Sequence, residues 1–183
     1  VQTTRFLVGY QPWPASCRRP CSVFEAVVFG VPGVIYPSLQ EVFAHYESEH
    51  ELPAGGLEAA RLANLDTWIE LELGERTLDD FVSEYQKTCE RHGFFADITN
   101  IISQYLPANA SVCQAAKELR LNSKKTHVVT NSWLIEPGET APWDLDPFDT
   151  VIESAIEGIC KPDGRLYSLL CARAATPPQD MVV

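Results

Sequence analysis

Residues 148–167 read FDTVIESAIEGICKPDGRLY. The stretch begins with residues 148–152, which predict a short strand, and it continues into residues that favour a helix over residues 162–172. The loop between these two elements, residues 157–163, carries Lys161 next to the expected helix start. Functional residues in open α/β sheets collect where strands end and helices begin. We therefore interpret this loop as a candidate anion site.

Two earlier segments have the same pattern of a strand followed by a loop. FEAVVF (residues 24–29) and THVVT (residues 126–130) are nearly continuous apolar runs, typical of strands that are buried on both faces. Gly30 follows the first run and Asn131 follows the second, and a fourth strand is expected at residues 181–183. Strands that alternate with helices predict the α/β class, with a doubly wound, Rossmann-like parallel sheet as the core.

The residues between the first two strands predict helices and no strand. Ser38 and Glu41 have the spacing of a capping box, and Thr77 with Asp80 marks a second helix start. One or two further helices are expected within residues 57–73. We expect five apolar side chains of that stretch to face inward: Leu62, Leu65, Trp68, Ile69 and Leu73.

These elements predict three parts of the chain. Residues 1–24 form a leader, residues 38–106 form an inserted helical cap, and residues 25–37 and 107–183 form the sheet core. The helix before the second strand is expected to begin with Ser111 as its N-cap, because a serine side chain can accept a hydrogen bond from the first turn.

The composition excludes some kinds of partner. The chain has 183 residues, with 14 Lys and Arg against 25 Asp and Glu, so its formal net charge is −11. This charge argues against a nucleic-acid partner, because phosphate backbones are bound by basic surfaces. Residues 38–92 alone carry 13 acidic and 4 basic residues. No apolar stretch reaches the roughly 18 residues of a membrane-spanning helix, so no membrane span is expected.

The cysteines and the leader bear on localisation. Six cysteines are spread through a chain that is too long to depend on disulfides, which favours a reducing, intracellular compartment. Residues 1–24 contain three arginines and no acidic residue, as the tail of a mitochondrial transit peptide does. The alternatives are therefore a mitochondrial protein, or a cytoplasmic protein with an ordinary proline-containing leader.

The stretch at residues 148–167 resembles the third motif of phosphatases of the haloacid dehalogenase (HAD) superfamily. In that motif a strand is followed by a Ser, a Gly, a Lys-Pro-Asp and an Ile/Leu-Tyr. AVVFGVPGVIYPS (residues 26–38) is similar to the first motif, and VVTNS (residues 128–132) is similar to the second. More narrowly, residues 25–183 resemble the N-terminal phosphatase-like domains of large acyl-CoA dehydrogenase fusion proteins and of soluble epoxide hydrolase.

This resemblance implies Mg²⁺-dependent hydrolysis of phosphomonoesters. In the family, an Asp after the first strand attacks phosphorus, and water then hydrolyses the aspartyl-phosphate. That Asp and an acidic motif after the fourth strand hold Mg²⁺, while the second and third motifs bind the phosphoryl oxygens. Thr130 and Lys161 match the phosphate-binding positions, and Asn131 belongs to the same expected site.

Both positions that hold the metal depart from the family pattern. Gly30 stands where the nucleophile is expected, and it has no side chain to attack phosphorus or to ligate a metal. Pro32 removes one backbone N–H from the following loop and restricts Val31 to extended conformations. The sequence ends at Val183, before the acids of the fourth motif would appear, so a C-terminally truncated core without bound Mg²⁺ is expected.

Three interpretations follow. The first is a phosphatase-like pseudoenzyme that retains a weak site at Lys161 for a small phosphorylated molecule. The second is a phosphate-binding, ligand-binding or protein-interaction module among the further domains of an acyl-CoA dehydrogenase-type fusion protein, with the acidic cap as its contact surface. The third is an enzyme that uses other residues near Lys161, for which Glu157, Cys160 and Asp163 are the candidates.

Overall fold

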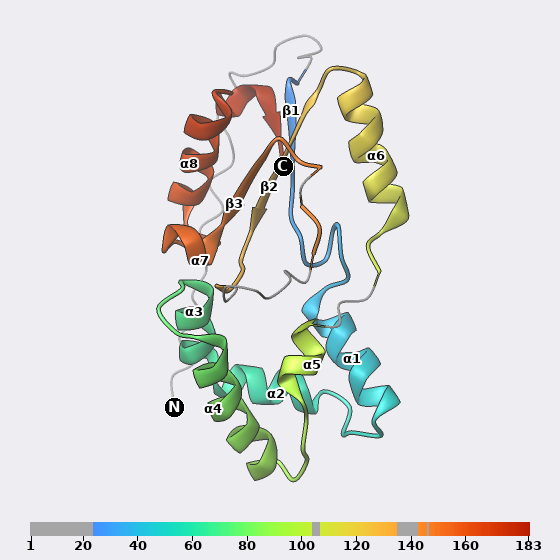
Figure 1. Ribbon diagram of the computed structural model, residues 1–183, viewed down its shortest axis with the longest axis vertical. Coiled ribbons are helices and arrows are strands. Elements are labelled where there is room, and N and C mark those ends of the chain that lie inside the picture. Colours follow the sequence, from blue (N-terminus) through green and yellow to red (C-terminus); the bar gives the residue numbers. More distant parts are fainter. Residues whose placement is uncertain (1–23, 104–106, 135–142, 146) are drawn as a thin grey trace, which may run out of the picture.

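The computed structural model describes residues 24–103, 107–134, 143–145 and 147–183 (Figure 1). Its centre is a parallel sheet with the strand order β3-β2-β1-β4. The strands are β1 (Ala26–Phe29), β2 (Lys125–Thr130), β3 (Thr150–Glu153) and β4 (Met181–Val182). Phe29 pairs with Val128, and Thr130 pairs with Glu153, so β1, β2 and β3 end at one edge of the sheet. The parallel α/β sheet predicted from the sequence is confirmed.

Helices cover the two faces of this sheet. Neighbouring residues of a strand point to opposite faces. In β2, Val128 packs on the side of α6 (Ala110–Leu121), and Val129 packs on the side of α8 (Gly164–Ala174). Figure 1 shows α6 and α8 on the two sides of the strands. The sheet is therefore doubly wound, as the alternation of strands and helices predicts.

Between β1 and β2 the chain forms helices with an apolar core of their own. They are α1 (Leu39–Glu49), α2 (Gly56–Ala63), α3 (Leu65–Glu72), α4 (Leu78–Arg91) and α5 (Ile98–Ser103), and we call them the bundle. Figure 1 shows the bundle beyond the carboxyl ends of the strands. Trp133, just after β2, packs against both the bundle core and the α6 side of the sheet, so it links the two apolar clusters.

Two helices of the bundle begin where their capping residues predict. The hydroxyl of Ser38 accepts a hydrogen bond from the backbone N–H of Glu41, whose carboxylate accepts one from the N–H of Ser38. Thr77 caps α4 in the same way through the N–H of Asp80. These caps satisfy backbone donors that have no partner within the helix.

The predicted N-cap of α6 is wrong. Asn109, rather than Ser111, caps this helix, because its carboxamide oxygen accepts hydrogen bonds from the N–H groups of Ser111 and Val112. Asparagine and serine are both good caps, and the sequence places them two residues apart. The three-dimensional path of the chain decides between them: the N–H of Asn109 donates to the carbonyl of Ile35 at 2.7 Å and so holds the start of α6.

The predicted inward face of residues 57–73 is also wrong in part. Leu62, Leu65 and Ile69 are 56%, 42% and 38% exposed. The helix breaks at Asn64, whose side chain donates a hydrogen bond to the carbonyl of Ala60. The break changes the direction of the second helix, so a single helical stripe cannot describe both segments. The buried side chains of these two helices are Leu57, Ala60, Trp68 and Leu71, of which Trp68 agrees with the prediction, and Leu73 is half-buried.

Two short elements complete the described chain: α7 (Ser154–Glu157) and a 3-10 turn at Pro178–Asp180. None of the described helices combines the length and the hydrophobicity that are needed to cross a lipid bilayer. The expected leader, residues 1–24, lies outside the described residues except for Phe24. The carbonyl of Phe24 accepts a hydrogen bond from Lys124 Nζ at 2.7 Å.

His127 is buried in the middle of β2 without a hydrogen-bond partner. It is 1% exposed, and neither ring nitrogen has a partner among the described residues. Burial lowers the pKa of His127, the nearby Asp149 carboxylate opposes this shift, and Lys125 adds to it. His127 therefore binds a proton less readily in the folded chain than in the unfolded chain, where histidine accepts one below about pH 6.5.

We predict that His127→Leu removes part of the acid sensitivity of the fold. In the natural chain, the free energy of unfolding falls as the pH drops below the unfolded pKa of histidine, about 6.5, because the unfolded state then binds more protons. Urea unfolding at pH 7 and about pH 5.5 measures this loss for both chains. His45→Gln, a change at an exposed histidine, is the control. An equal loss in the natural chain and in His127→Leu would contradict the prediction.

Candidate functional site

The sheet edge under the bundle brings together three of the residues singled out from the sequence. A Cβ atom built on Gly30, at the end of β1, would lie 4.0 Å from Lys161 Nζ. The backbone N–H of Lys161 donates to Asn131 Oδ1 at 2.8 Å, and its Nζ lies 3.4 Å from the carbonyl oxygen of Val129. The loop before α8 is thus fastened to the end of β2 with its ammonium group directed toward β1.

Thr130 lies at the same edge but is fully buried. Its hydroxyl donates to the carbonyl of Asn131 at 2.9 Å. A hydroxyl has a single proton to donate, so Thr130 must leave this local bond before it can donate to an anion.

The two acids that flank Lys161 in the sequence are turned away from it. Asp163 caps α8 by accepting from the N–H of Arg165 at 2.8 Å, and its carboxylate also pairs with the Arg165 guanidinium. These bonds lower the pKa of Asp163. Glu157 pairs with Arg173. Neither carboxylate is aimed at the position that a nucleophile would occupy.

Cys160 is also poorly suited to act as a nucleophile. Burial raises the pKa of its thiol, and the Glu72 carboxylate raises it further. The thiolate is the reactive form of cysteine, so this environment makes the side chain less nucleophilic.

Glu72 is the residue of the site that the sequence did not indicate. It is the last residue of α3, and its Oε2 accepts a hydrogen bond from Asn131 Nδ2 at 2.7 Å. Its Oε1 accepts from the indole N–H of Trp68 at 2.9 Å. The bundle therefore contributes a carboxylate to the sheet edge, next to the lysine.

The backbone of Glu72 is held as firmly as its side chain. The Ser154 hydroxyl donates to the carbonyl of Glu72 at 2.6 Å and accepts from the N–H of Ser132 at 2.9 Å. Ser154 is the serine of the motif at residues 148–167, and it is fully buried. One hydroxyl thus joins the end of β2, the end of β3 and the end of α3.

Burial is the largest influence on the pKa values of Glu72 and Lys161. It raises the pKa of Glu72 and lowers the pKa of Lys161, because each charged form is removed from water. The attraction between the two groups opposes the shift at both, and the hydrogen bonds from Trp68 and Asn131 also lower the pKa of Glu72. Glu72 is thus a negative charge that acts on Lys161, although the two groups form no ion pair.

In the loop after β1, backbone N–H groups donate hydrogen bonds to carbonyl groups of the same loop. Pro32 has no N–H, the N–H of Gly33 donates to the carbonyl of Tyr36 at 2.8 Å, and the N–H of Tyr36 donates to the carbonyl of Val31 at 3.0 Å. These groups are therefore not available to surround a phosphate.

The residues at this edge do not fit a magnesium site. Mg²⁺ takes oxygen ligands in a near-octahedral arrangement, usually with one or two carboxylates. Gly30 has no side chain, and both oxygens of Glu72 already accept hydrogen bonds. Across the described ranges, no group of three or more His, Cys, Asp or Glu side chains is placed to hold a metal ion.

Gly74 brings the backbone of the bundle into direct contact with the core. Its φ is +71°, and a Cβ atom built on it would lie 2.3 Å from the carbonyl oxygen of Ala155 in α7. Any other residue would collide with this carbonyl. The contact follows α3 by two residues and so keeps Glu72 at the sheet edge.

Two curated proteins are similar to this chain in sequence. Acyl-CoA dehydrogenase family member 10 of Mus musculus is 30% identical over 171 residues, which is 87% of this chain and 16% of the mouse protein. Bifunctional epoxide hydrolase 2 of Sus scrofa is 28% identical over 184 residues, which is 86% of this chain and 32% of the pig protein. The chain thus spans less than a third of the length of these relatives. No family model matches the sequence.

Solved structures with similar folds are HAD hydrolases. A HAD family enzyme from Bacteroides thetaiotaomicron, solved as a magnesium complex, has a TM-score of 0.60 and 12% identity, covering 87% of this chain and 82% of that chain. L-2-haloacid dehalogenase from Xanthobacter autotrophicus has a TM-score of 0.56 and 19% identity, covering 86% of this chain and 68% of that chain. At these identities the likeness shows the fold, and it confirms the resemblance seen in the motifs.

We predict that Gly74→Ala loosens the contact between the bundle and α7. Alanine in a left-handed conformation costs about 1–2 kcal/mol, and the clash with Ala155 adds overpacking of roughly 1–3 kcal/mol. Gly93→Ala is the matched control, since Gly93 also has a positive φ (+86°) but nothing within 4 Å of its built Cβ. Urea unfolding should show the larger loss for Gly74→Ala, and only this variant should shift the amide signal of Asn131. Equal losses in the two variants would show that the close approach does not matter.

Proposed function

Because this chain has the fold of the HAD hydrolases, we propose that it is a phosphatase-like domain that does not hydrolyse phosphomonoesters. In this proposal residues 38–106 are the cap, and residues 25–37 and 107–183 are the core. The proposal rests above all on Gly30. Its built Cβ lies 4.0 Å from Lys161 Nζ, so an aspartate there would face the lysine, whereas glycine leaves no carboxylate at the end of β1.

What remains is a weak site for a phosphoryl group. Lys161 is the attracting charge, and two unit charges about 4 Å apart interact by roughly 4 kcal/mol at an effective dielectric near 20. Glu72 is a fixed negative charge at the same edge and repels an incoming anion. Asn131 is already bonded to both the loop and the bundle. These features support weak binding of phosphate, without turnover.

We propose phosphate, rather than another ligand bound by proteins of this fold, because of the residues in the motifs. The structural neighbours include a haloacid dehalogenase, so the fold alone does not select the chemistry. The support for phosphate is the resemblance of residues 148–167 and 128–132 to the phosphatase motifs, together with Lys161, Asn131 and Thr130 at one edge.

The second candidate is a non-catalytic ligand-binding or interaction module of a larger protein. The observation that favours it is the length of the curated relatives, of which this chain covers 16% and 32%. Residues 38–92, which carry 13 of the 25 acidic residues, would be its contact surface. A mitochondrial or cytoplasmic location remains a prediction.

We predict that the chain releases no phosphate from p-nitrophenyl phosphate in the presence of Mg²⁺. Among the described residues at the edge, Gly30 has no side chain, and Asp163 and Glu157 are paired with arginines. Both oxygens of Glu72 are already held by hydrogen bonds, so no carboxylate is placed to form the covalent intermediate. The measurement is the release of p-nitrophenol by the natural chain and by Lys161→Met. Release that disappears in Lys161→Met would overturn the proposal, because it would locate turnover at this site. Release that is equal in both chains would come from a contaminant.

We predict that inorganic phosphate at millimolar concentration shifts the amide NMR signals of Asn131 and Lys161. Lys161→Met should abolish these shifts, whereas Lys87→Met, at an exposed lysine of α4, should leave them unchanged. Binding requires the charged ammonium group and is lost as the pH rises through the pKa of Lys161. Since burial lowers that pKa, the loss should occur below the usual lysine range near 10.4.

The same titration tests the opposing role of Glu72. Glu72→Gln removes the negative charge and should strengthen phosphate binding, by about tenfold if the repulsion is near 1.4 kcal/mol. Glu70→Gln, at a neighbouring residue that pairs with Arg76, is the control on the same helix. The absence of any phosphate-dependent shift in the natural chain and in Glu72→Gln would reject the anion site while leaving the absence of turnover intact.

A further inference from the structure

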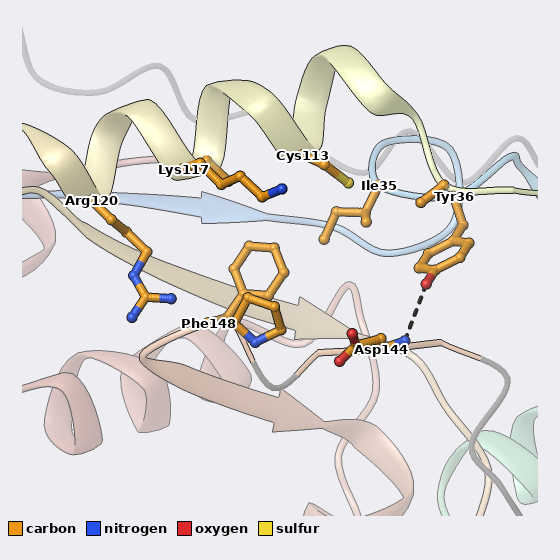
Figure 2. A pocket seen from close by; sticks show the side chains of 10 residues that line it. Ile35, Tyr36, Cys113, Lys117, Arg120, Asp144 and Phe148 are labelled. Atoms are coloured by element: carbon orange, nitrogen blue, oxygen red, sulfur yellow. Dashed lines mark hydrogen bonds between the residues drawn. The ribbon is translucent and has the colours of Figure 1, made fainter.

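A cavity lies on the α6 side of the sheet and does not include Lys161. Its volume is about 230 Å³, and it lies between α6, the loop after β1 and the residues just before β3 (Figure 2). This is below the roughly 300 Å³ at which pockets for drug-sized ligands begin, so it suits a compact molecule. None of its lining residues belongs to the site around Lys161.

Apolar side chains form most of the wall. They are Ile35, Ala108, Cys113, Ala116, Pro147 and Phe148. The ring of Phe148 contacts that of Phe29 in β1 with 5.7 Å between centroids, so it is held in place from behind. At one end, the Tyr36 hydroxyl accepts from the backbone N–H of Asp144 at 3.1 Å and joins two walls of the cavity, as Figure 2 shows. These two contacts hold Phe148 and Tyr36 in their positions in the wall.

Two cationic side chains of α6 stand at this apolar wall. Lys117 and Arg120 are three residues apart and so lie on the same face of the helix, and both line the cavity. Arg120 makes a long contact of 3.9 Å with Asp149, and Lys117 has no carboxylate within ion-pair distance among the described residues. An acidic chain with a net charge of −11 thus exposes two positive charges beside an apolar hollow.

The carboxylate of Asp144, which also lines the cavity, limits the kind of anion that fits. In the view of Figure 2, Arg120 and Asp144 lie on opposite sides of Phe148. A ligand with negative charge at both ends would meet the Asp144 carboxylate, whereas a ligand with one charged end would not. The cavity combines an apolar wall, a cationic side and an acidic side.

We propose that this cavity binds a compact amphipathic monoanion, an aryl or short alkyl acid. Its apolar body contacts Ile35, Cys113 and Phe148, and its carboxylate points to Lys117 and Arg120. The apolar contact supplies most of the binding, and the two cations orient the headgroup. Charge complementarity therefore selects an acid over the neutral or cationic molecule of the same shape.

The test is an NMR titration of the full chain with phenylacetate. Saturable shifts are expected at the amides of Cys113, Lys117, Arg120 and Phe148, while that of Lys161 stays in place. Phenylacetamide has nearly the same shape without the charge, so it should bind about tenfold more weakly, as expected for the loss of a charge-assisted hydrogen bond. Phenethylamine, which carries a positive charge, should bind no better than the amide.

Variants separate the charges from the apolar wall. Lys117→Gln/Arg120→Gln should bring the affinity for phenylacetate down to that for phenylacetamide. Both residues are exposed on a helix in which glutamine is well tolerated, so the fold should persist. Lys87→Gln in α4 is the control and should change nothing. The proposal is overturned if phenylacetate causes no saturable shift at α6, if the amide binds equally well, or if the double variant keeps the affinity of the natural chain.

Discussion

The carboxamide of Asn131 joins three parts of the molecule. Its oxygen accepts from the N–H of Lys161 at 2.8 Å, and its nitrogen donates to Glu72 at 2.7 Å. A carboxamide presents an acceptor and donors side by side, which neither a carboxylate nor a hydrocarbon side chain can do. The end of β2 therefore fixes both the loop before α8 and the last turn of α3. This one side chain thus contacts both the loop that carries the lysine and the carboxylate of Glu72.

This arrangement determines the electrostatic character of the sheet edge. A buried ammonium group is costly unless an opposite charge lies near it. Gly30 supplies none from β1, and Glu72 supplies one from the bundle. The carboxylate of Glu72 accepts hydrogen bonds from Asn131 and Trp68, which hold it in place. A group held by two hydrogen bonds is suited to balance charge, and poorly suited to attack a substrate.

Much of the sheet could be predicted from the sequence, because short apolar runs that end in Gly or polar residues are local signals. Lys161 and Asn131 could be placed together for the same reason, since parallel strands end at one edge. Glu72 could not be found in this way. It is one of many acids on amphipathic helices, and its role arises only from the way in which the bundle lies on the sheet. Leu62 and Leu65 were misplaced because the break at Asn64 depends on a side-chain bond to Ala60.

The close approach of Gly74 to Ala155 restricts how the bundle can move. Because the two backbones are in contact, any opening of the bundle would have to carry it away from α7 and the sheet edge. Such a movement would carry Glu72 with it and break its bond to Asn131. For any anion that enters from the bundle side, the opening of the path and the departure of the competing carboxylate are therefore one and the same motion.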